Sequence, residues 1–201
     1  MKLFRIISVA AAIGLAGCAP TYTLVSPAPA NMAPVSTAKG TIKVKPTMAW
    51  NKIPKGVYDV KWEENWTRNG PLLDGISFIG GLPDGEAIAK QRKKDDQKVP
   101  VFRATMSPQH LVSMIESYYR IKAGASIFET TGVAPATFLG QQGLQFDYTY
   151  VGGDEVQRKG RSLVAIISGK LYLMALDGTA SHYFDTALPE FEAMAASATL
   201  G

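Results

Sequence analysis

The sequence predicts an α+β protein in which an antiparallel β-sheet is flanked by two main helices. Three observations support this class. Apolar and polar residues alternate over residues 144–150, which is typical of a strand with one buried face. Apolar residues recur at helical spacing over residues 108–122, and again from Phe184 to Ala198. The order is therefore several strands, a helix, a run of antiparallel strands and a closing helix.

The first half of the folded part contains three predicted strands, at residues 41–45, 58–66 and 72–79. In the second strand, Tyr58, Val60 and Trp62 alternate with charged residues. The third strand is interrupted by Asp74 and Gly75. The glycine-rich stretch that follows, residues 80–85, predicts a turn.

The middle of the chain predicts a loop and then a helix. Residues 90–98 (KQRKKDDQK) carry both signs of charge and no apolar residue, which favours a solvated loop or exposed helix end over a binding patch. Ser107 before Pro108 suits a helix N-cap followed by proline at the first helical position. We therefore expect an amphipathic helix over residues 108–122.

The second half predicts further strands, at residues 125–130, 136–139, 144–150, 162–167 and 171–176. The last two are almost continuously apolar, as central strands are, and Ser168 with Gly169 predicts a tight hairpin between them. The final helix should cover one face of the sheet. We expect Pro189 to begin or kink this helix rather than lie within it.

The N-terminus resembles the signal peptide of bacterial lipoproteins. Lys2 and Arg5 precede an apolar region of eleven residues, 6–16, which is too short to span a bilayer. Leu15-Ala16-Gly17-Cys18 resembles a lipobox, and the chain has no other cysteine. The resemblance implies cleavage after residue 17, a diacylglyceryl thioether on Cys18 and an acylated new N-terminus. The alternative is an ordinary secretory signal with a chance cysteine.

The residue after Cys18 bears on location. In Gram-negative lipoproteins an aspartate there favours retention in the inner membrane, whereas this chain has Ala19. The resemblance therefore implies an outer-membrane anchor with the domain facing the periplasm. Two or more acyl chains anchor a protein stably, so the membrane contact would run through the lipid on Cys18.

Composition limits the possible partners and the domain organisation. Without Lys2 and Arg5 the chain has 19 basic and 17 acidic residues, a net charge too small to indicate nucleic acid. Residues 18–40 are rich in proline, alanine, serine and threonine, and predict an extended tether that could reach roughly 60 Å. Residues 41–201 should then form a single α+β domain after a signal peptide over residues 1–17.

The last sixty residues resemble the superfamily that contains the photosystem II extrinsic subunit PsbP and a yeast Ran-binding nuclear-import factor. The resemblance rests on the alternating 144–150 strand, the hairpin over residues 161–176 and a closing helix with Phe184 and Phe191. It lies at the level of the fold and implies a PsbP-like domain. Members of this superfamily are mostly non-catalytic binding or assembly modules.

No catalytic or metal-binding motif is found in the sequence. His110 and His182 lack metal-ligand spacing and should be surface or capping residues. Glu63 and Glu64 are adjacent on a predicted strand, so they should point to opposite faces and form no carboxylate pair. We therefore predict a protein that is not an enzyme and that uses no cofactor or metal.

Tyr58, Trp62 and Trp66 are the candidate binding residues. Trp62 and Trp66 would share a strand face, and with Tyr58 they could line an aromatic binding surface, although core packing is the favoured interpretation. The leading hypothesis is a lipid-anchored, non-catalytic binding or assembly module for an envelope component. The alternative is a small-molecule or lipid carrier, which a pocket lined by Tyr148, Tyr150 or Trp62 would favour.

Overall fold

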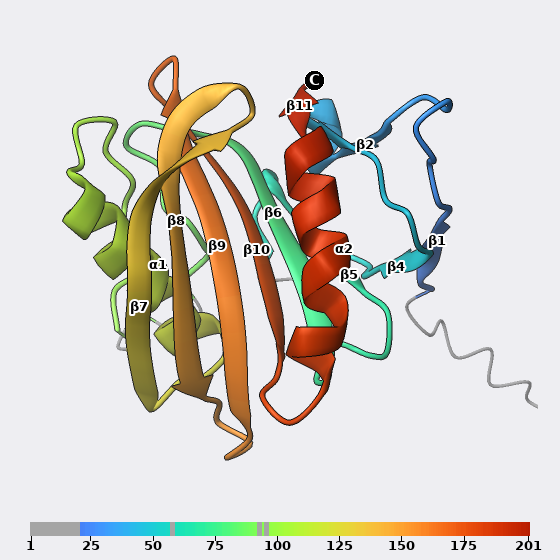
Figure 1. Ribbon diagram of the computed structural model, residues 1–201. Helices are drawn as coiled ribbons and strands as arrows, with labels where there is room; N and C mark the ends of the chain where they lie inside the picture. Colours follow the sequence, from blue (N-terminus) through green and yellow to red (C-terminus); the bar gives the residue numbers. More distant parts are fainter. Residues whose placement is uncertain (1–20, 57–58, 92–93, 95–96) are drawn as a thin grey trace, which may run out of the picture.

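The computed structural model describes residues 21–56, 59–91, 94 and 97–201 (Figure 1). Within these residues, eight strands form one sheet, and every neighbouring pair is antiparallel. In spatial order the strands are β1 (Thr23–Val25), β4 (Trp50–Lys52), β5 (Glu63–Thr67), β6 (Asp74–Pro83), β10 (Lys170–Thr179), β9 (Gln157–Ile167), β8 (Gln141–Val151) and β7 (Ile127–Phe138). A smaller antiparallel sheet contains β11 (Thr199–Leu200), β3 (Ile42–Val44) and β2 (Val35–Thr37).

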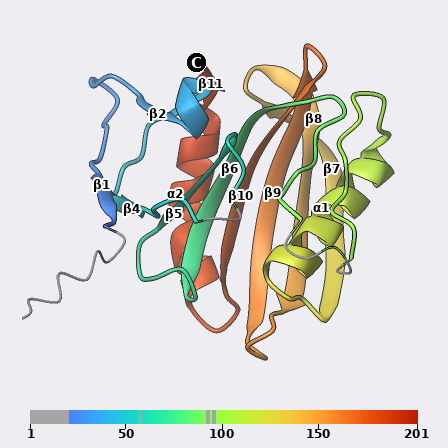
Figure 2. The ribbon, with the colours of Figure 1, turned by 180° about the vertical axis from the view of Figure 1, so that it is seen from behind.

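The two helices pack against different sides of the large sheet. Side chains of α1 (Pro108–Lys122) pack into one buried cluster with Phe146, Leu173 and Ala175, whereas side chains of α2 (Tyr183–Ser197) pack into another with Met174 and Leu176. Successive residues of β10 thus belong to different clusters, because side chains alternate between the faces of a strand. In Figure 1, α2 lies in front of the sheet and α1 lies behind it, and Figure 2 shows the reverse. The predicted combination of a large antiparallel sheet with two helices is confirmed.

The strands in the second half of the sheet agree with the prediction, except that two predicted strands form a single strand. Ser168 and Gly169, at φ 49° and 74°, form the predicted hairpin turn between β9 and β10. The two strands expected at 125–130 and 136–139 are instead one strand, β7, whose pairing with β8 shifts register around Gly132. Pro135 is tolerated within β7 because an edge strand has one row of unpaired backbone groups.

The first half differs more from the expected strands. β5 begins only at Glu63, so the strand expected from Tyr58 onward is shorter, and Tyr58 itself lies outside the described residues. β6 runs through Gly80 and Gly81, where a turn was expected. Gly81, at φ 70°, lies where the pairing with β10 shifts register, so it forms a bulge that lets the strand continue.

Both helices begin near where the sequence placed them. Ser107 caps α1 by accepting a hydrogen bond from the His110 N–H, and Pro108 is its first residue, as predicted. The prediction for Pro189 is wrong, because this residue lies inside α2. Pro189 is exposed, while the apolar face of α2 is buried in the core. Tertiary packing of an apolar face thus outweighs the hydrogen bond that proline omits.

Residues 21–40 are folded rather than an extended tether. β1 pairs with β4, β2 pairs with β3, and a short 3₁₀ turn (Ala38–Gly40) follows β2. Ala28 is buried and donates its N–H to the Pro46 carbonyl at 2.7 Å. The prolines of this segment lie outside the strands, so they do not prevent pairing. The tether expected over residues 18–40 is therefore wrong for the part that the structure describes.

Candidate functional site

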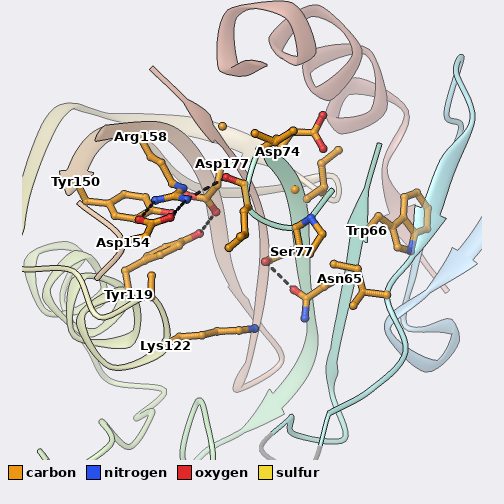
Figure 3. A pocket seen from close by; sticks show the side chains of 18 of the residues that line it. Asn65, Trp66, Asp74, Ser77, Tyr119, Lys122, Tyr150, Asp154, Arg158 and Asp177 are labelled. Atoms are coloured by element: carbon orange, nitrogen blue, oxygen red, sulfur yellow. Dashed lines mark hydrogen bonds and ion pairs between the residues drawn. The ribbon is translucent and has the colours of Figure 1, made fainter. Parts of the chain in front are cut away.

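A cavity of about 630 Å³ lies where the end of α1 meets the beginning of β6 and the end of β10 (Figure 3). Apolar and aromatic side chains, including Leu73, Tyr119 and Tyr150, make up much of its lining. Its titratable lining side chains are Asp59, Asp74, Tyr118, Tyr119, Lys122, Tyr150, Asp154, Arg158 and Asp177. Its volume falls in the range of small-molecule sites, which are usually apolar with a few convergent polar groups.

Asp177 is the central polar residue of the cavity. Its Oδ2 accepts a hydrogen bond from the Tyr119 hydroxyl at 2.7 Å, and its Oδ1 lies 2.9 Å from the Tyr148 hydroxyl. The two tyrosine hydroxyls also lie 2.7 Å apart. Burial raises the pKa of Asp177 to about 6, against the opposing effects of the two tyrosines and of Lys122 and Arg158.

Backbone register explains how Tyr148 reaches Asp177 across an intervening strand. Tyr148 of β8 lies opposite Gly160 of β9, which in turn lies opposite Asp177 of β10. A Cβ atom at Gly160 would overlap the ring of Tyr148. On the other side of Asp177 the paired residue is Gly75, which also lines the cavity. The row Tyr148–Gly160–Asp177–Gly75 thus places a carboxyl group between two residues without side chains.

A second polar group joins α1 to β5. Lys122 forms an ion pair with Glu63, and its Nζ donates to the Tyr118 hydroxyl at 2.8 Å. The Tyr118 hydroxyl donates to Glu63 Oε1 at 3.0 Å, and Asn65 Nδ2 donates to the same oxygen at 2.8 Å. Burial lowers the pKa of Lys122, while the charges of nearby carboxylates oppose this effect. This cluster leaves Lys122 already paired with a carboxylate.

Arg158 and Asp154 close another side of the cavity. The guanidinium donates to both carboxylate oxygens, at 2.8 and 2.7 Å, and to the Leu72 carbonyl at 2.9 Å. The hydrogen bonds from Arg158 hold the pKa of Asp154 well below its usual range. The same guanidinium lies 6.0 Å from the ring centre of Tyr150, its neighbour across the strands. This bidentate pair fixes the turn between β8 and β9 to the chain before β6.

The structure does not bring the predicted site residues together. Trp62 and Trp66 are both buried but belong to different core clusters, so the expectation that they share a strand face is wrong. The reason is that β5 begins after Trp62, so strand alternation does not extend to that residue. Trp66 lines the cavity, and its indole N–H donates to Glu64 at 2.8 Å. Trp62 lines a separate hollow beside Lys61. Cys18 and Tyr58 lie outside the described residues.

Other sequence predictions can be placed directly. Glu63 contacts Tyr118 of α1, whereas Glu64 contacts Trp66 of the α2-side cluster, which agrees with their predicted opposite directions. His110 and His182 are exposed at the starts of α1 and α2, as expected. Among the described residues, no group of three or more His, Cys, Asp or Glu side chains could hold a metal ion. In the same part of the chain, no helix is long and apolar enough to span a membrane.

Sequence reasoning missed Asp177, Lys122 and Arg158 as site residues. One pattern pointed to the first of them: Leu171, Leu173 and Ala175 face the α1 side, so the next inward position of the strand is occupied by a charged residue. Burial of a carboxyl group at an inward strand position is costly unless hydrogen bonds or charge pairing compensate it, so such a residue indicates a candidate site. For Lys122 the sequence carries no comparable pattern, since its partner Glu63 comes from a distant segment. Arg158 has its partner Asp154 only four residues away, but a local ion pair does not by itself indicate a site.

Comparison with known proteins identifies the fold class. No protein-family model and no curated protein matches the chain. Among solved structures, the solution structure of cyanobacterial PsbP (CyanoP) from Synechocystis sp. PCC 6803 is similar, with a TM-score of 0.50 and 16% identity over 88% of this chain and 98% of that chain. The chain therefore has a PsbP-like fold. LpqN, described as involved in cell envelope biogenesis of Mycobacterium tuberculosis, also matches, with a TM-score of 0.35 and 12% identity over 92% of this chain and 87% of that chain.

Proposed function

We propose that this protein is a lipid-anchored, non-catalytic binding module of the bacterial envelope, and that the cavity beside α1 is its ligand site. The cavity itself carries the proposal: it has the volume of a small-molecule site, with aromatic walls and the carboxyl group of Asp177 among its lining side chains. The lipobox-like segment ending at Cys18 supports the anchor, and Ala19 supports an outer-membrane location facing the periplasm.

The pairing of the polar groups favours binding over catalysis. Lys122 is paired with Glu63, Arg158 with Asp154, and the Ser77 hydroxyl donates to Asn65 at 2.7 Å. A nucleophilic serine needs an adjacent base that accepts its proton, whereas this hydroxyl contacts an amide oxygen. Groups that satisfy one another in advance suit a preorganised binding site, because little reordering is needed when a ligand enters.

Equilibrium dialysis of a neutral naphthyl compound tests this function. The full chain is reconstituted in phosphatidylcholine nanodiscs and dialysed against 2-(1-naphthyl)ethanol, with empty nanodiscs as the blank. We expect saturable binding of one molecule per chain. Ser77→Phe places a ring in the cavity and should weaken binding at least tenfold, whereas Val133→Phe, at an exposed position of β7, should not. Absence of saturable binding of this compound and of its ammonium and carboxylate analogues, or equal loss in both variants, would overturn the proposal.

A second candidate function is docking of an envelope protein on β7. This strand is an edge of the large sheet, and Ile127 and Val133 are 56% and 51% exposed. Exposed edge strands present unpaired backbone groups to which a partner strand can add. Crosslinking from Ile127 in intact cells tests this candidate: a discrete crosslinked protein that is lost when Val133 is replaced by proline supports it, and uniform background labelling contradicts it.

A further inference from the structure

We propose that the ligand of this cavity carries a cationic amine on an apolar body and that the amine binds Asp177. The inference rests on the proposed function, because it names the ligand class for the same site. It follows from three features of the cavity: the balance of charge on its lining, the number of protons available around Asp177, and the aromatic side chains beside it.

The lining charges favour a cation. Four aspartates line the cavity against one lysine and one arginine. Both of these cations already have a carboxylate within ion-pair distance. Lys122 is paired with Glu63, and Arg158 is paired with Asp154 at 2.7 Å. Asp177, by contrast, contacts neutral hydroxyls among the described residues. A cavity with an excess of one charge concentrates ligands of the opposite sign.

The contacts around Asp177 lack one proton when its carboxyl group is ionised. Tyr119, Tyr148 and Asp177 form a closed ring of three contacts at 2.7, 2.7 and 2.9 Å. Each tyrosine hydroxyl has one hydrogen to donate. Two hydrogens therefore serve three contacts, unless Asp177 carries a third. An ammonium group in the cavity offers the carboxylate a hydrogen-bond donor and a positive charge in place of that proton, so the carboxyl group can release it.

Because amine binding displaces the proton of Asp177, the affinity for the amine should depend on pH. The charged and titratable groups around Asp177 come from α1, β8 and β9: Tyr118, Tyr119, Lys122, Tyr148, Tyr150 and Arg158. The nearest of these, the two tyrosine hydroxyls, are neutral because burial raises their pKa well above the ordinary value. Asp177, whose pKa burial raises to about 6, therefore changes charge between pH 5 and 7, and amine affinity should rise over this interval.

The aromatic side chains suit both parts of such a ligand. The rings of Tyr119 and Tyr150 lie 5.6 Å apart, and both line the cavity together with Trp66. Aromatic faces attract cations, and their carbon surface packs against apolar groups. An aryl- or alkylamine can thus place its charge at Asp177 and its hydrocarbon against these rings.

Three matched compounds test the ligand class. The full chain in nanodiscs is dialysed against 2-(1-naphthyl)ethylammonium, 2-(1-naphthyl)ethanol and 3-(1-naphthyl)propionate at pH 7, with empty nanodiscs as the blank. We expect the ammonium to bind at least tenfold more tightly than the alcohol, and the carboxylate to bind most weakly. Between pH 5 and 7 the ammonium affinity should increase severalfold, while the affinity for the alcohol stays constant.

A charge-matched pair of variants completes the test. Asp177→Asn should remove the preference for the ammonium and its pH dependence. Asp185→Asn removes the same charge from an exposed position on α2 and should change neither. If Asp177→Asn does not fold, the wild-type selectivity and pH profile decide alone. Equal binding of alcohol and ammonium, or tighter binding of the carboxylate, would overturn the amine inference and leave the cavity function standing. Failure of all three compounds to bind would overturn the proposed function itself.

Discussion

Gly160 and Gly75 determine the shape of the site at the scale of single residues. They lie on either side of Asp177 in one row across the sheet, and neither carries a side chain. Tyr148 fills the space above Gly160, and the cavity extends over Gly75. The strand positions that carry no side chain thus matter as much here as those that carry one.

Gly160→Ala should destabilise the fold because the added methyl group overlaps the ring of Tyr148. We expect a loss of about 1–3 kcal/mol, as for other overpacked cores. Urea unfolding of residues 21–201 measures the change. The same substitution in a Tyr148→Ala background should cost clearly less, since the overlapping ring is gone. An equal cost in both backgrounds would show that the overlap is not the cause.

Asp177 should make the protein less stable as the pH rises from about 4 to 6. Its pKa is raised to about 6 in the fold, whereas an unfolded aspartate titrates near 3.9. Between these values the native state binds a proton that the unfolded state has lost, so the free energy of unfolding falls with pH until both states are ionised. Urea unfolding at pH 4, 5, 6 and 7 should show this fall in the wild type and not in Asp177→Asn. A difference between the two proteins that is constant over this range would contradict it.

At the scale of elements, the sequence predicted the features that depend on residues close to one another in the chain. The alternation around Phe146 and the N-cap of α1 depend on neighbours in the sequence, and both were predicted well. The length of β6 depends on a bulge at Gly81 that only pairing with β10 explains. The cavity was not predicted, because Asp177, Lys122 and Arg158 meet only once three distant segments have packed.

Phe146→Ala tests the inward face of β8. Phe146 is fully buried in the α1-side cluster, so its truncation should cost about 3–5 kcal/mol. Gln145, on the other face of the strand, is only partly buried, and Gln145→Ala should cost little. The comparison uses urea melts of the two variants. Similar losses at both positions would mean that the alternation does not set the packing of this strand.

At the scale of the whole molecule, the N-terminal segment is part of the fold. β1 and β2 pair with β4 and β3, and Val25 and Ala28 are buried. A chain of residues 41–201 should therefore be less stable than residues 21–201, by about 2–4 kcal/mol from lost apolar burial. Urea midpoints of the two chains measure this. Equal midpoints would show that the first two strands add nothing to stability.

Cys18→Ser tests the anchor. The lipobox-like segment is the feature that favours membrane attachment. The variant should escape lipoprotein processing, and any cleaved form should be found in the soluble fraction. A cleaved Cys18→Ser protein that stays wholly with the membrane would disprove a lipid anchor at this residue.

The pairing of β1 with β4 also limits how far the domain can travel. If the lipid is on Cys18, only four residues lie between it and Thr23, where the chain joins the sheet, so the two are five residue steps apart. A fully extended chain of that length reaches about 18 Å. The short linker would then keep the domain beside the bilayer surface, whereas a long tether would let it move far from the membrane. The domain could then bind only molecules within or beside the membrane that holds it, because the opposite membrane would lie beyond the reach of its linker.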